Sequence, residues 1–176
     1  MSTPAGNQEN IPTTVAEDSQ NKIVVRTADG KVFELKKEVA MEISTIKAFI
    51  EEDNISYETA MPLHNVESWE LEKVIEYCSN YVDLKGKDKE LKAFQSEYIK
   101  DMSPKSLLDL TNTANYLEIK YFLDFLCKTV SDQIKNKDVD FVRKLFQLEN
   151  DFSGEEYEKV KAEHPWAHEN LDDDFH

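Results

Sequence analysis

The sequence predicts an α+β fold, in which a small sheet opens the chain and helices make up the rest. The β-branched run Ile23–Thr27 is followed by a second short strand, Val32–Leu35. Asp29-Gly30 lies between them and predicts a hairpin turn, because glycine accepts a positive φ. From Ser68 onward, apolar residues recur at spacings of three and four, the period of an amphipathic helix. We therefore expect the strands to come first in the chain and the helices to follow.

The length of 176 residues suits one domain with tails, or two small subdomains that share a core. Residues 1–21 are polar with few large apolar groups, so we expect a flexible tail there. An N-terminal part follows over residues 22–82, a charged linker over 83–92 and a helical part over 93–170. Residues 171–176 form an acidic tail.

Before the first long helix we expect short elements only: helices at Lys37–Met41 and Ser44–Glu51, a loop at Asn54–Ala60 and a strand at Met61–Leu63. The proline in that strand restricts it to an edge or terminal position of the sheet. The first long helix is Ser68–Val82, since Leu71, Val74 and Cys78 share one face.

Five helices are expected in the remainder of the chain: Lys92–Tyr98, Ser103–Tyr116, Ile119–Lys135, Val139–Phe146 and Ser153–Glu163. Three of them begin with capping signals. Ser103 precedes a proline, Asp138 precedes an apolar run, and Ser153–Glu156 fits a capping box.

The charge of the chain limits its partners. It has 36 acidic against 21 basic residues, a formal net charge of −15. Such a surface repels phosphate backbones and anionic lipids, and no Lys/Arg cluster offsets it, so nucleic-acid binding is disfavoured. No apolar run approaches the ~20 residues that span a bilayer, and residues 1–21 do not resemble a secretory signal. We expect a soluble, intracellular protein without a membrane partner.

Few residues suggest catalysis or metal binding. The two cysteines, Cys78 and Cys127, lie in helical apolar patterns outside any CxxC pair, so two buried, reduced thiols are expected. His164 and His168 are four apart, but Pro165 separates them and no third ligand follows. The four glycines form no phosphate-binding cluster. We therefore expect no catalytic residue, metal or cofactor.

The helix expected at Ile119–Lys135 carries more apolar residues than one buried face requires. One stripe consists of Leu123, Cys127, Val130 and Ile134. A second stripe, beside it, consists of Ile119, Phe122 and Leu126, with Phe125 at its edge. The helix is either buried on two sides or packs one stripe inward and offers the other to a partner, and the period does not distinguish these. The apolar residues on the neighbouring short helices favour a binding groove.

One segment, Ala114–Lys120, reads ANYLEIK and resembles the ANYLDIK signature of the Skp adaptor family (S-phase kinase-associated protein 1 and its relatives). The resemblance is colinear from Ile23 to Asn170 and includes Asp29-Gly30, Thr45–Lys47, Pro62-Leu63, Cys127–Val130, Val142–Lys144 and Asn150–Phe152. Asn136 stands where the family usually has glycine, so the chain resembles a divergent paralogue within that family. The resemblance implies a BTB/POZ-type domain, completed by helices in residues 93–170 that also form an F-box-binding extension.

The resemblance also implies a function. The chain would be a non-catalytic adaptor that links F-box proteins to a cullin in SCF-type ubiquitin ligases and supports protein degradation in cytoplasm and nucleus. Asn115 and Tyr116 would face the cullin. The F-box would contact Leu107, Leu108, Leu123, Cys127, Val130, Ile134, Phe146 and Trp166. The alternative is a BTB-type self-association scaffold, but a minimal module of that type lacks the helical extension.

Overall fold

A computed structural model describes residues 22–53 and 60–169 of the chain. The expected tails at 1–21 and 171–176, and the loop at 54–59, lie outside these residues. The three strands form one sheet in the order β2-β1-β3: β1 is Lys22–Thr27, β2 is Val32–Lys36 and β3 is Met61–Leu63. β1 pairs antiparallel with β2 and parallel with β3.

The local predictions for the sheet are confirmed. Gly30 has φ +84°, the left-handed conformation that the hairpin turn requires. β3 is an edge strand, as its proline predicts, and Pro62 is exposed.

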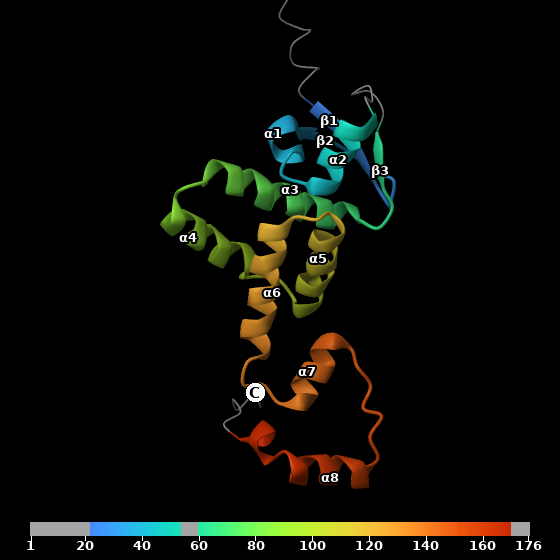
Figure 1. Ribbon diagram of the computed structural model, residues 1–176, viewed down its shortest axis with the longest axis vertical. Helices are drawn as coiled ribbons and strands as arrows, with labels where there is room; N and C mark the ends of the chain where they lie inside the picture. Colours follow the sequence, from blue (N-terminus) through green and yellow to red (C-terminus); the bar gives the residue numbers. More distant parts are fainter. Residues whose placement is uncertain (1–21, 54–59, 170–176) are drawn as a thin grey trace, which may run out of the picture.

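Helices cover the sheet and extend away from it: α1 is Lys37–Ala40, α2 is Ser44–Asp53, α3 is Ser68–Asp83, α4 is Asp88–Ile99, α5 is Pro104–Tyr116, α6 is Lys120–Ile134, α7 is Val139–Phe146, α8 is Gly154–Glu163, and a short 3-10 helix, η2, is Pro165–His168. α3 lies between the sheet and the α5–α6 pair, whereas α7 and α8 lie at the far end of the molecule (Figure 1).

The helix boundaries follow the capping signals. The side chain of Ser103 accepts a hydrogen bond from the backbone N–H of Ser106 at 3.1 Å, and that of Asp138 from Phe141 at 2.6 Å. Ser153 and Glu156 form the predicted capping box at the start of α8. These three predictions are confirmed, because a cap needs only neighbouring residues to form.

One expected boundary is wrong. α4 begins at Asp88, inside the segment 83–92 that we expected to be a linker. Its first turn carries Asp88 and Glu90, and acidic side chains stabilise a helix near the positive end of its dipole. The charges that indicated a linker therefore help to start a helix.

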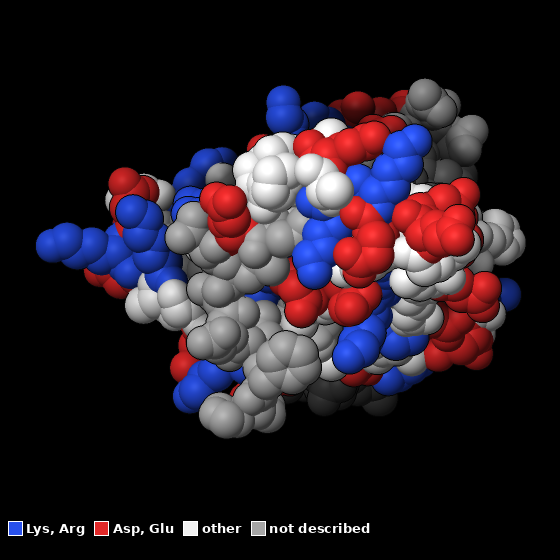
Figure 2. Space-filling model, turned by 90° about the horizontal axis from the view of Figure 1, so that it is seen from below, with Lys and Arg blue, Asp and Glu red and all other residues white. Residues whose placement is uncertain are grey.

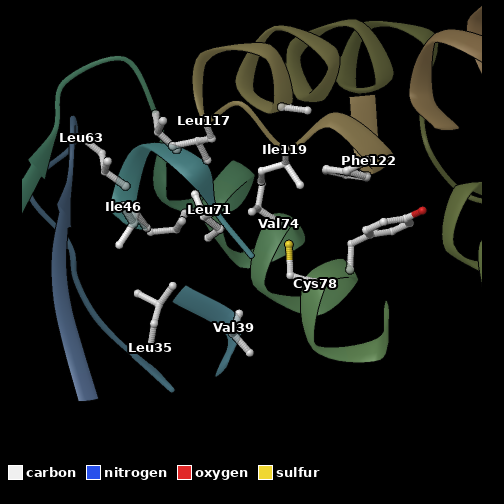
Figure 3. Packing of buried hydrophobic residues seen from close by; sticks show 14 of the residues in the cluster. Leu35, Val39, Ile46, Leu63, Leu71, Val74, Cys78, Leu117, Ile119 and Phe122 are labelled. Atoms are coloured by element: carbon white, nitrogen blue, oxygen red, sulfur yellow. The ribbon is translucent and has the colours of Figure 1, made fainter. Parts of the chain in front are cut away.

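An apolar core joins the sheet to the helices (Figure 3). Leu35 and Leu63 contribute from the strands, and Leu71, Val74 and Cys78 from α3, as their helical spacing predicts. Aromatic rings continue the core between α3 and α6, where the ring centroids of Tyr77 and Phe122 are 4.1 Å apart. This packing holds the α5–α6 pair against the α/β half.

Asn136 is the second residue after the end of α6 and has φ +60°. Glycine is the usual residue in this left-handed conformation, and asparagine is among the few others that adopt it at moderate cost. The departure from the family pattern thus keeps the backbone turn that leads from α6 to α7.

Candidate protein-binding surfaces

A groove of about 550 Å³ lies between α5, α6 and α7. Its lining residues come from α5, α6 and α7: Leu108, Thr111, Asn112, Cys127, Val130, Ser131, Ile134 and Phe146. We call this hollow the apolar groove. It is large enough to accept several side chains of a partner.

The two apolar stripes of α6 have different surroundings. Phe122 and Leu126 are completely buried in the core, together with Ile119 just before the helix. On the groove side, Cys127 is exposed and Val130 is half-buried. Of the two arrangements that the sequence allows, the structure is nearer to the one in which α6 packs one stripe inward, because the other stripe stays partly exposed.

Five of the eight residues predicted to contact an F-box line the apolar groove: Leu108, Cys127, Val130, Ile134 and Phe146. The other three do not line it. Leu107 is only 1% exposed and belongs to the core, and Leu123 is half-buried against that core. Successive helical residues point about 100° apart, so Leu107 and Leu108 cannot face the same way.

The third residue outside the groove, Trp166, is 74% exposed in η2. Other large apolar side chains of the C-terminal part are also exposed: Leu148, Phe152 and Val160. No residue of α8 is buried among those described. The C-terminal helices therefore present apolar surface that the described part of the chain does not cover.

Polar residues of the groove were missed by the sequence reasoning. Thr111 and Asn112 follow Leu108 by three and four residues, and Ser131 follows Cys127 by four. This spacing places them on the same helix faces, and it could have identified them. The apolar pattern alone does not indicate these polar residues.

The expectation of two buried thiols is wrong for Cys127, which is exposed, and right for Cys78. An apolar stripe predicts a shared face, but not whether that face is covered. Burial raises the pKa of the Cys78 thiol to about 11, although a hydrogen bond from the Tyr121 hydroxyl at 3.3 Å opposes the shift.

A second surface lies where α5 ends and α6 begins, close to α3 and the sheet half of the molecule (Figure 1). Asn115 is exposed there, whereas Tyr116 is half-buried and packs against the core. Glu118 has φ +55°, which reverses the chain between the two helices. We call the exposed part of this connection the α5–α6 turn. It is about 12 Å from Leu108, given eight helical residues at 1.5 Å each.

Other candidate chemistry finds ordinary structural explanations. The adjacent acids Glu155 and Glu156 begin α8, and hydrogen bonds from the Ser153 backbone N–H and hydroxyl lower the pKa of Glu156. Within residues 22–53 and 60–169, no three His, Cys, Asp or Glu side chains are grouped as metal ligands. Nor does any helix of that part of the chain combine the length and apolar character needed to cross a membrane.

Charged side chains of both signs are interspersed on the surface seen from the α8 end (Figure 2). Acidic and basic groups alternate over this face and leave uncharged areas between them. This face therefore carries no single basic field of the kind that tracks a nucleic-acid backbone.

Comparison with known proteins supports the resemblance seen in the sequence. Residues 21–83 match the family model described as Skp1 family, tetramerisation domain, and residues 120–167 match that of the Skp1 family, dimerisation domain. "SKP1-like protein 20" of Oryza sativa subsp. japonica is 39% identical over 178 residues, covering 88% of this chain and 100% of the relative. "SKP1-like protein 1A" of Arabidopsis thaliana is 39% identical over 162 residues, covering 86% of this chain and 99% of the relative. The chain therefore belongs to the Skp1 family, the adaptor subunits of SCF-type ubiquitin ligases.

Proposed function

We propose that this adaptor joins its two partners through separate surfaces, with the F-box in the apolar groove and the cullin on the α5–α6 turn. One observation carries the proposal: α6 buries Phe122 and Leu126 completely, yet leaves Cys127 exposed and Val130 half-buried in the lining of a groove. An uncovered apolar stripe beside a hollow is typical of a site for an amphipathic helix.

The composition of the groove supports a helical, mainly apolar partner. Val130, Ile134 and Phe146 provide apolar contacts, and Thr111 and Ser131 provide hydroxyl groups at the side. Groups of this kind fix the orientation of a partner, while the apolar area provides most of the free energy of binding. The exposed Trp166 and Phe152 would extend the contact along the partner.

The α5–α6 turn suits a second partner because it is separate from the groove. Tyr116 offers a large, stiff side chain with a polar end, a residue type that often dominates interfaces. Its partial burial against the core restricts its movement, so binding would cost little additional side-chain entropy.

Reconstitution tests the proposal directly. We expect the purified chain to form a 1:1:1 complex with an F-box domain and a cullin N-terminal domain, measured by light scattering after size exclusion. Each partner should also bind in the absence of the other, because the two surfaces do not overlap. Self-association of the chain with no binding of either partner would instead support a BTB-type scaffold.

We further propose that the chain carries no ubiquitin itself. A thioester needs a reactive thiolate, but Cys78 is buried with a raised pKa, and the groove lining around Cys127 contains no basic side chain. A reconstituted ligase containing Cys127→Ser should therefore transfer ubiquitin as fast as one containing the unaltered chain, provided that the variant binds the F-box equally well. A reducible ubiquitin adduct on the unaltered chain that Cys127→Ser or Cys78→Ser removes would contradict this.

A further inference from the structure

Thr45 connects the α/β half of the molecule to the α5–α6 turn. It is the second residue of α2, and its hydroxyl donates a hydrogen bond to the Tyr116 carbonyl at 3.1 Å. Its backbone N–H donates to the Leu117 carbonyl at 3.4 Å. The bonded residues Thr45 and Tyr116 are 71 positions apart in the sequence.

The two bonds satisfy groups that a helix cannot pair internally. The first N–H groups of a helix and its last carbonyls have no partner within that helix. Here α2 begins where α5 ends, so a free N–H of α2 meets a free carbonyl at the end of α5. The hydroxyl of Thr45 then occupies the second carbonyl, that of Tyr116.

The rest of the turn is held by local contacts. Leu117 and Ile119 are fully buried, and their N–H groups bond back to Thr113 at 2.9 Å and to Ala114 at 3.0 Å. These bonds stabilise the C-terminal end of α5 locally. The bonds from Thr45, by contrast, determine where the end of α5 lies relative to α2.

We infer that Thr45 is a positioning residue for the cullin-binding surface, which it orients through the Tyr116 carbonyl without having to touch the cullin itself. This inference rests on the proposed function, in which Asn115 and Tyr116 form that surface. Loss of the hydroxyl leaves the Tyr116 carbonyl without this partner, and the turn can then shift relative to α2. A shift of a side chain that anchors an interface reduces affinity, because part of the binding free energy is spent on restoring its position.

A selective effect is expected because the apolar groove does not depend on this bond. Its lining residues begin at Leu108, about 12 Å along α5 from Tyr116. A general loss of stability would weaken the binding of both partners, whereas a displaced turn would weaken only the binding of the cullin. The ratio of the two affinities therefore distinguishes positioning from a merely structural role.

The test uses the full chain and three variants. Thr45→Val removes the hydroxyl and keeps the shape of the side chain, whereas Thr45→Ser keeps a hydroxyl at the same place. Ser44→Ala is the matched control, since it removes an exposed hydroxyl from the adjacent position of α2. Dissociation constants for a cullin N-terminal domain and for an F-box domain are measured by calorimetry, at a temperature where circular dichroism shows each variant folded.

We expect Thr45→Val to weaken cullin binding about 5- to 10-fold, the effect of one lost hydrogen bond, and to leave F-box binding unchanged. Thr45→Ser and Ser44→Ala should bind both partners as the unaltered chain does. Unchanged cullin binding by Thr45→Val, or an equal loss for both partners, would overturn the inference and leave the proposed function intact. Failure of the unaltered chain to bind the cullin would overturn both.

Discussion

Val130→Asp is expected to abolish F-box binding while the free protein stays folded. Val130 lies on α6, half-buried, in the lining of the apolar groove. In the complex, an aspartate there would be removed from water without a pairing group, which costs several kcal/mol and lowers the affinity more than 100-fold. In the free protein the same carboxylate can reach water, so the loss of stability should be small.

Two measurements on this variant decide the role of the stripe. Calorimetry with an F-box domain gives the affinity, and a thermal melt of the free variant gives the stability. Gln133→Asp is the matched control, because it adds the same charge to α6 outside the groove lining. If the variant unfolds, Val130 belongs to the core on which folding depends. If the variant is folded and binds the F-box normally, the F-box does not bind at this face of α6.

Replacement of both Asn115 and Tyr116 by lysine should weaken cullin binding by ~2 kcal/mol or more, about 30-fold. The loss arises because an aromatic anchor disappears and two charges enter a surface that must be desolvated on binding. F-box binding should persist, since neither residue lines the apolar groove. Surface plasmon resonance with each partner separately measures the two affinities.

The double variant also makes the net charge more positive, so a control for this change in charge is needed. Glu90→Lys, on the exposed side of α4, shifts the charge by the same two units away from the turn. It should leave cullin binding nearly unchanged. The double variant could also melt like the unaltered chain but lose affinity for both partners equally. In that case the assignment of two separate surfaces would be wrong.

Several features of this protein follow from its sequence alone, because they depend on neighbouring residues. Gly30 permits the hairpin turn, and Ser103, Asp138 and Ser153 each cap the helix that follows them. Caps and turns form between groups within four residues of each other, so their residue types predict them. Helical spacing likewise predicts which side chains share a face. The same reasoning placed three residues of the apolar groove, Cys127, Val130 and Ile134, on one face of α6.

Tertiary structure alone decided which of those faces is covered. The stripe of Phe122 and that of Val130 are both apolar and have the same period. One of them is core because of the elements packed against α6, namely α5 and α3, whose Tyr77 ring stacks on Phe122. Cys127 is exposed for the same reason, since no described element covers the groove side of α6. The bond from Thr45 to Tyr116 spans 71 positions of sequence. A contact of that range depends on the folding of everything between its ends, which no local pattern of residues encodes.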